Sequence, residues 1–215
     1  TFSTTVSCIL RNRLVPVYVD VVPGTYVIDV DAIEAKISDK TAAVVIPNLV
    51  GNIPDWEKIS EICKKHDLLM VEDSADTLGG TLHGKPSGHW SDISITSYYG
   101  SHVINCAGNG GLLSVNRDAW AERGKLLRSW GRSSSLFVDS EAIENRFNVE
   151  LDGIPYDAKF VFSDVGHNFE PSELGAAFGL VQLAKLEDNI KAREWAFARQ
   201  TEYFRKYEDW FELPV

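Results

Sequence analysis

The sequence predicts an α/β fold in which a mostly parallel sheet carries helices on both faces. Segments rich in β-branched residues alternate along the chain with segments of helical periodicity, as they do in consecutive strand–helix units. Residues 41–49 and 68–73 are apolar almost throughout, which is typical of strands covered on both faces. The chain has 215 residues, which is enough to bury a sizeable core in one or two domains.

Each element has its own local signal. Residues 3–13 are expected to form a short helix capped by Ser3 or Thr4. Residues 15–21 are β-branched and aromatic, so we expect a strand there. Residues 55–67 have the apolar spacing of an amphipathic helix. The remaining expected elements are helices over residues 29–37, 118–130 and 172–211, and strands over residues 93–100 and 110–115.

The segment 132–170 differs in character from the rest of the chain. It is long, polar and only weakly periodic, which predicts an irregular insertion, and its aromatic residues argue that the insertion is ordered. The chain begins without Met, in what resembles a loop that leads into a helix, and it ends in Leu-Pro-Val, which resembles a hinge. We therefore expect a fragment of a longer protein.

Composition and charge argue against several classes of function. The 21 Lys and Arg are outnumbered by 31 Asp and Glu, and they form no basic stripe, so nucleic acid is not an expected partner. The three cysteines, Cys8, Cys63 and Cys106, include no Cys-x-x-Cys pair, which predicts neither a disulfide framework nor a metal site and fits a cytoplasmic protein. The sequence contains no signal-peptide pattern and no apolar run of the ~20 residues that span a bilayer, so a membrane is not an expected partner.

Polar residues follow several of the expected strands. Asp73 ends one apolar run, and Ser97 and His102 follow the next strand along the chain. Ligands of open α/β sheets bind at the carboxyl ends of the strands, so these side chains predict a binding site at that edge. The spacing from Asp73 through Ser97 to His102 suggests that the ligand is a cofactor.

Five stretches taken in order resemble the DegT/DnrJ/EryC1/StrS family of sugar aminotransferases, and together they extend over essentially the whole chain. The stretches are residues 15–52, "VEDSADTLGG" at 71–80, "SDISITSYYGSH" at 91–102, "GNGGLLSV" at 108–115, and residues 165–186. The resemblance implies pyridoxal 5′-phosphate or pyridoxamine 5′-phosphate as cofactor and a homodimer. It also implies that residues 1–215 are the large domain of an aspartate-aminotransferase-like (type I) fold. That domain would have a mostly parallel seven-stranded sheet and be truncated at both ends.

The same resemblance implies roles for single residues. Asp73 would face the pyridine nitrogen of the cofactor, Ser97 would bind its phosphate, and Phe2 would stack on its ring. Asn168 would reach the partner's phosphate across the dimer interface, and Asp76 stands beside the ring where the family usually has Gln. Taken alone, four of these residues have a simpler reading: Asp73 as a turn carboxylate, Ser97 as a strand-end hydroxyl bonded to its own backbone, Phe2 as a core aromatic and Asn168 as a loop amide.

His102 occupies the position of the lysine that, in the aminotransferases of this family, bonds covalently to the cofactor. Histidine cannot form that bond, but it can accept and donate a proton near neutral pH. The family's nucleotide-sugar 3-dehydratases, such as the GDP-4-keto-6-deoxymannose 3-dehydratases, make the same replacement. The resemblance to them extends over the insertion, where Ser133–Ser135 replace the cysteines of the iron–sulfur version, so no cluster is expected.

These observations predict an enzyme that removes the C3 hydroxyl of a nucleotide-linked 4-keto-6-deoxyhexose. The setting would be the biosynthesis of deoxysugars for cell-surface polysaccharide such as lipopolysaccharide. His102 and Asp73 would be catalytic, and glutamate would supply the amine. Two alternatives stay open: an aminotransferase-like enzyme with a displaced base, and a non-catalytic member that uses only its dimer surface. Cys106 as a nucleophile is a more distant alternative.

Overall fold

The computed structural model describes residues 1–214 and divides the chain into two compact units. The first unit joins Thr1–Ser114 with the segment from Glu173 onward, and the second is Val115–Ser172. Within residues 1–214, no helix has both the length and the apolar character that a bilayer span requires.

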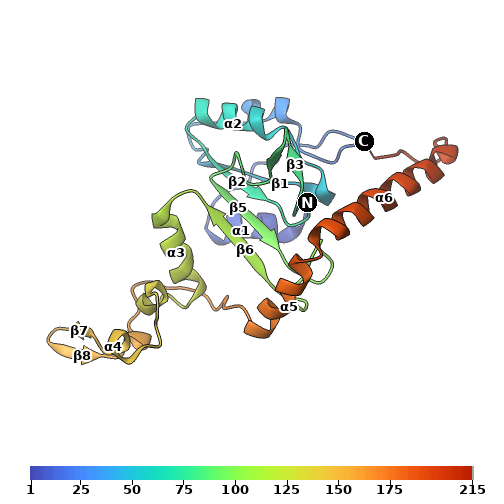
Figure 1. Ribbon diagram of the computed structural model, residues 1–215. Helices are drawn as coiled ribbons and strands as arrows, with labels where there is room; N and C mark the ends of the chain where they lie inside the picture. Colours follow the sequence, from blue (N-terminus) through green and yellow to red (C-terminus); the bar gives the residue numbers. More distant parts are fainter. Residues whose placement is uncertain (215) are drawn as a thin grey trace. The chain divides into compact units, whose positions relative to one another are not determined.

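A four-stranded sheet in the order β1-β2-β5-β6 organises the first unit (Figure 1). Its strands are β1 (Ala43–Pro47), β2 (Leu69–Asp73), β5 (Ile93–Ser97) and β6 (Gly111–Val115). β1 pairs with β2 and β2 with β5 in parallel, and the register sets Pro47 opposite Asp73 and Asp73 opposite Ile95. The carboxyl ends of these three strands therefore lie at one edge of the sheet, as the sequence predicts.

The expectation of a mostly parallel seven-stranded sheet is not confirmed. The sheet is mixed, and in the described part of the chain the other strands form two small antiparallel hairpins. These are β3 (Thr81–Leu82) with β4 (Lys85–Pro86), and β7 (Val149–Leu151) with β8 (Ile154–Tyr156). Residues 15–21, expected to be a strand, pair only through an isolated bridge between Val21 and Ile28, so they have no neighbouring strand to complete a ladder.

Helix α2 (Trp56–Lys65) covers the sheet and forms the core with it. Trp56, Ile59 and Cys63 are fully buried against residues of β1 and β2, which confirms the amphipathic helix expected there. Asp55 caps the helix, since its carboxylate accepts a hydrogen bond from the backbone N–H of Lys58 at 3.0 Å. The helical spacing of the apolar residues thus decides which face is buried.

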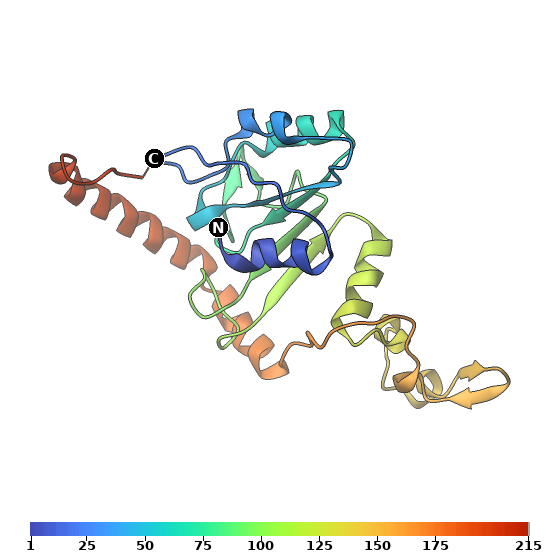
Figure 2. The same ribbon diagram turned by 180° about the vertical axis from the view of Figure 1, so that it is seen from behind.

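Helix α1 (Ser3–Arg11) runs in front of the strands when the chain is viewed from behind (Figure 2). Its N-cap is Phe2 rather than the expected Ser3 or Thr4. The helix expected over residues 29–37 is instead two short 3₁₀ turns on either side of Ile33, whose side chain is buried. These turns are η1 (Val30–Ala32) and η2 (Glu34–Lys36), and a third 3₁₀ turn, η3 (Leu49–Gly51), follows β1.

The long helical pattern that begins at residue 172 forms two helices, α5 (Glu173–Leu183) and α6 (Leu186–Phe204), followed by the 3₁₀ turn η6 (Arg205–Tyr207). A tight bond from the Lys185 N–H to the Gln182 carbonyl closes α5. Gly179 of α5 packs directly against Cys106: a Cβ added there would come 2.4 Å from the Cys106 sulfur. The absence of a side chain at Gly179 therefore permits this close contact.

The second unit contains α3 (Asp118–Arg128) and the insertion expected over residues 132–170. Short elements follow one another in the insertion: η4 (Ser133–Leu136), α4 (Ile143–Arg146), the β7–β8 hairpin and η5 (Ala158–Phe160). Asp152 and Gly153 join β7 to β8 with φ angles of 51° and 79°. An Asp-Gly pair suits this left-handed two-residue turn, and it is the local signal for a hairpin that the sequence analysis did not use.

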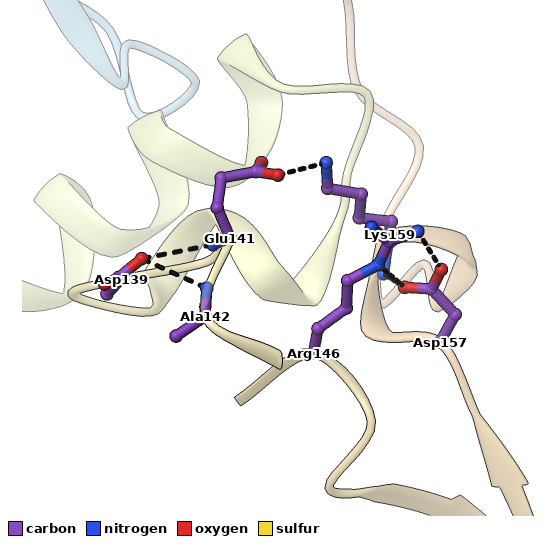
Figure 3. Close-up of polar contacts among 6 residues, drawn as sticks. All are labelled: Asp139, Glu141, Ala142, Arg146, Asp157 and Lys159. Atoms are coloured by element: carbon purple, nitrogen blue, oxygen red, sulfur yellow. Dashed lines mark hydrogen bonds and ion pairs between the residues drawn. The ribbon is translucent and has the colours of Figure 1, made fainter. Parts of the chain in front are cut away.

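Ion pairs and capping bonds order the insertion (Figure 3). The Arg146 guanidinium donates one hydrogen bond to each oxygen of the Asp157 carboxylate, at 2.8 Å and 2.5 Å. Lys159 contacts the Glu141 carboxylate at 2.6 Å, and the Asp139 carboxylate accepts hydrogen bonds from the backbone N–H groups of Glu141 and Ala142, in the turn that precedes α4. The segment is thus a set of short elements joined by polar contacts.

Candidate active site

Asp73 is the last residue of β2, and its backbone is fixed from both sides. Its carbonyl accepts a bond from the Asn48 N–H at 2.9 Å, and the next residue, Ser74, donates to the Ile95 carbonyl at 2.9 Å. The carboxylate is also held: the Thr5 hydroxyl of α1 donates to Oδ2 at 2.7 Å, and the Ala75 N–H donates to Oδ1 at 3.2 Å. One donor on each oxygen fixes the direction in which this half-buried carboxylate faces.

Glu72 precedes Asp73 and points to the opposite face of the strand. Its carboxylate is fully buried and accepts four hydrogen bonds, all from neutral donors. The donors are Asn48 Nδ2 at 2.8 Å, Ser74 Oγ at 2.7 Å, the Gly88 N–H at 2.8 Å and Ser91 Oγ at 3.0 Å. The Glu72 side chain therefore ties the end of β2 to β1 and to the loop before β5, directly beneath the site.

The segment after β5 places Ser97 and His102. The Ser97 hydroxyl accepts a bond from the Tyr99 N–H at 3.2 Å, and the His102 N–H donates to the Tyr99 carbonyl at 3.1 Å. Tyr98 anchors the loop, because its carbonyl accepts from the Cys106 N–H at 3.0 Å. His102 thus lies on a turn that begins immediately after the strand. The bond from the Tyr99 N–H matches the simpler interpretation of Ser97 as a hydroxyl bonded to nearby backbone. Because Ser97 is the acceptor in this bond, its own O–H can still donate to another group.

The imidazole of His102 contacts a second carboxylate at this edge of the sheet. Nδ1 of His102 lies 3.0 Å from Oδ1 of Asp76, which is on the loop after β2. The side chain of His102 is 19% exposed, and the ring of Tyr99 packs against it edge to face, with 6.3 Å between the ring centroids. The histidine is therefore sheltered and held in one orientation.

The other residues singled out from the sequence are placed differently. Phe2 begins α1 in the same unit, but its side chain is 72% exposed, so its stacking role stays a prediction. Asn168 belongs to the second unit, where it forms a bridge with Ser129 after α3. Thr5 is the contact that sequence reasoning missed. The sequence places Thr5 within the expected helix, but no local pattern shows which face of that helix meets β2.

The residues present fit a pyridoxal phosphate cofactor. Such a cofactor requires a carboxylate at its ring nitrogen, a hydroxyl for its phosphate and a group that transfers a proton. Each oxygen of Asp73 accepts one bond and has a second lone pair, so the carboxylate can accept a further N–H. Ser97 retains a donor, and His102 offers an imidazole. Asp73, Ser97 and His102 therefore supply the three kinds of group that the cofactor requires.

Comparison with known proteins shows which proteins this chain is similar to. A model of the DegT/DnrJ/EryC1/StrS aminotransferase family matches residues 1–215. The chain is 36% identical over 205 residues to a dTDP-4-dehydro-2,6-dideoxy-D-glucose 3-dehydratase of Saccharopolyspora spinosa. This match covers 93% of this chain and 44% of that protein. It is 33% identical over 179 residues to a GDP-perosamine synthase of Caulobacter vibrioides, which covers 83% of this chain and 42% of that protein.

The fold is also that of solved aminotransferases. PseC of Helicobacter pylori, an aminotransferase involved in the biosynthesis of pseudoaminic acid, matches with a TM-score of 0.79 at 26% identity, over 95% of this chain and 49% of that chain. The chain thus spans about half the length of the proteins it matches. The family depends on pyridoxal or pyridoxamine phosphate, and the fold is of the α/β, aspartate-aminotransferase-like kind. The chain belongs to the DegT/DnrJ/EryC1/StrS aminotransferase family.

Proposed function

We propose that the protein carrying this chain removes the C3 hydroxyl of a nucleotide-linked 4-keto-6-deoxyhexose, with pyridoxamine phosphate as cofactor. One observation carries the proposal. The turn after β5, at the edge of the sheet where β2 ends in Asp73, carries the imidazole of His102 rather than a lysine amine. An imidazole can move protons but cannot attach the cofactor covalently, so the cofactor stays free to react with a sugar ketone.

Three residues of this chain have direct roles in the proposal. Pyridoxamine phosphate, when bound, supplies an amine for the sugar ketone and a ring that takes up an electron pair. Asp73 keeps a proton on the pyridine nitrogen. The Thr5 hydroxyl and the Ala75 N–H hold the Asp73 carboxylate in its orientation. His102 takes a proton from the carbon that carries the amine and delivers it to the C3 hydroxyl as that group leaves.

Over the whole conversion, the C3–O bond of the sugar is replaced by a C3–H bond. The two electrons would come from pyridoxamine phosphate, whose CH₂–NH₂ group would be oxidised to the aldehyde of pyridoxal phosphate while its nitrogen is released as ammonia. Glutamate would then restore the amine. We further propose that residues 1–215 are the cofactor-binding large domain, that the protein is a homodimer, and that Asn168 contacts the partner's cofactor phosphate. Ser97 would bind the phosphate of the cofactor held in its own chain, and Phe2 would stack on its ring.

Two comparisons support different reactions for this site. The 36% identity to a sugar 3-dehydratase supports the loss of oxygen at C3. The 33% identity to a GDP-perosamine synthase favours a second candidate, a nucleotide-sugar aminotransferase that acts with a base displaced from the usual lysine position. In that case the amine would remain on C4 of the sugar, and the C3 hydroxyl would be retained.

Mass spectrometry of the products distinguishes these reactions. The intact protein is incubated with pyridoxamine phosphate and a panel of dTDP-, GDP- and CDP-linked 4-keto-6-deoxyhexoses, and the nucleotide sugars are then analysed. We expect a product that has lost one oxygen atom, together with free ammonia. A 4-amino product would support the aminotransferase, and the absence of cofactor binding would indicate a non-catalytic member of the family.

A further inference from the structure

Asp76 is the carboxylate in contact with the His102 ring, although it neither ends a strand nor lies next to His102 in sequence. It is on the loop after β2, and its Oδ1 is 3.0 Å from Nδ1 of His102. The loop is fixed at its base, because the Asp73 carboxylate accepts the Ala75 N–H and the Thr77 N–H donates to the Ser74 carbonyl. The position of the Asp76 carboxylate is therefore set by the same turn that orients Asp73.

The contact selects one nitrogen of the imidazole. A neutral imidazole has one N–H and one lone pair, and a carboxylate accepts hydrogen bonds without donating any. With Asp76 at Nδ1, the proton of neutral His102 belongs on Nδ1, and the lone pair is on Nε2. The Tyr99 ring restrains the plane of the imidazole but does not distinguish its two nitrogens. The carboxylate is the group that decides where a proton can be taken up.

Two other histidine–carboxylate pairs among residues 1–214 show that this arrangement is particular to His102. His66 contacts Glu34 through Nε2 at 2.8 Å, which is the opposite nitrogen. His83 contacts Glu57 through Nδ1 at 3.3 Å, but its side chain is 65% exposed. Only 19% of the His102 side chain is exposed, so solvent competes less for its ring nitrogens. An imidazole and a carboxylate interact more strongly where water is displaced.

We propose that Asp76 is a positioning residue that holds the Nδ1–H tautomer of His102, so that Nε2 is the nitrogen that transfers the proton. The same carboxylate stabilises the imidazolium formed after proton uptake. This inference rests on the proposed function, in which His102 moves protons during dehydration. It also accounts for an acid at a position where the family usually has Gln, because a neutral amide would give the imidazolium no charge stabilisation.

The tautomer is tested directly by NMR of the intact protein labelled with ¹⁵N-histidine, at a pH where the imidazoles are neutral. The His102 signals are assigned by their loss in His102→Asn. We expect the unmutated protein to show Nδ1 protonated and Nε2 bare, and Asp76→Ala to show a mixture of both tautomers. Glu34→Gln is the matched control, and it should change the signals of His66 only. An Nε2–H tautomer of His102 in the unmutated protein would overturn the proposal.

Kinetics provide the second measurement. Asp76→Ala should lower kcat for dehydration by about 10- to 100-fold with little change in KM, because it removes orientation and charge stabilisation but leaves the base in place. Asp76→Asn retains an acceptor oxygen without charge, so it should keep the tautomer but lose part of kcat, and Asp76→Glu should recover most of the activity. A kcat of Asp76→Ala equal to that of the unmutated protein would refute the positioning role.

The two measurements separate this inference from the proposed function. The NMR experiment needs no turnover, so the Asp76 assignment can be judged even if the protein makes no 3-deoxy sugar. A loss of the Nδ1–H tautomer in Asp76→Ala supports the inference in either case. An unchanged tautomer in Asp76→Ala overturns it, including when dehydration occurs as proposed. Unfolding in urea checks that each variant is folded.

Discussion

The hydroxyl of Thr5 donates a 2.7 Å hydrogen bond to Oδ2 of Asp73, which lies 68 residues further along the chain. The bond joins helix α1 to the end of β2 and aims the carboxylate that we place at the cofactor ring. A hydrogen bond to a charged group contributes about 1.5–3 kcal/mol, and its loss leaves Asp73 less well oriented. The contact therefore provides a test of Asp73 that leaves Asp73 itself unchanged.

Replacing Thr5 by Val keeps the shape of the side chain and removes the donor. We expect the affinity of the intact protein for pyridoxamine phosphate to fall about 10- to 100-fold, as measured by calorimetry. Thr5→Ser is the matched control, because it retains the hydroxyl and should bind almost normally. Equal affinities for the Val and Ser variants would show that the Thr5 bond does not support cofactor binding.

His102 is tested by two substitutions with opposite chemistry. His102→Asn should still bind the cofactor but lose dehydration by ~10²–10⁴-fold, which is the usual contribution of a general base. His102→Lys should acquire a covalent link to pyridoxal phosphate that borohydride fixes to the chain, and its product should shift towards the amino sugar. Dehydration by His102→Asn at the unmutated rate would exclude the imidazole as base. Borohydride fixation of the unmutated protein would mean that another lysine holds the cofactor.

Glu72 is expected to matter for stability. Its carboxylate is fully buried and accepts four hydrogen bonds, so Glu72→Gln would turn an amide N–H₂ group towards donors. We expect the free energy of unfolding to fall by about 2–4 kcal/mol. Glu61→Gln, at an exposed position of α2, is the control and should have almost no effect. Urea titration measures both, and equal stabilities would contradict the structural role.

Burial raises the pKa of the Cys63 thiol to about 11, and the nearby Asp92 carboxylate adds to the shift. At pH 8 the thiolate of Cys63 should therefore be scarce, and iodoacetamide should modify exposed Cys8 well before it modifies Cys63 in the folded protein. Peptide mass spectrometry follows both sites. Modification of Cys63 as fast as that of Cys8 would contradict the burial seen here.

The same shift makes stability depend on pH in a defined direction. Between the ordinary pKa of 9.0 and the raised value of about 11, folded Cys63 keeps its proton while the unfolded chain loses it. The folded state then binds more protons, so stability should fall as the pH rises through this window. Cys63→Ser removes this ionisation, and its stability should fall less steeply over the same range. Urea titrations of both proteins across the window measure the difference.

Much of the sheet could be predicted from the sequence because its signals are local. The apolar runs that become β1 and β2 and the helical spacing that becomes α2 each identify an element without knowledge of its neighbours. The strand expected over residues 15–21 was not found, because a strand also needs a partner with free backbone groups, and no local pattern supplies one. The number of strands in the sheet depended on the same tertiary pairing.

The candidate site divides in the same way. The sequence by itself determined that Asp73 ends a buried strand, that Ser97 ends the next strand, and that an imidazole stands at position 102. Only the tertiary structure decided that Thr5 aims Asp73 and that Asp76 meets Nδ1 of His102. These contacts join segments far apart in the chain. Their geometry follows from how α1 and the loops after β2 and β5 pack around one edge of the sheet, and no local pattern of residues encodes that packing.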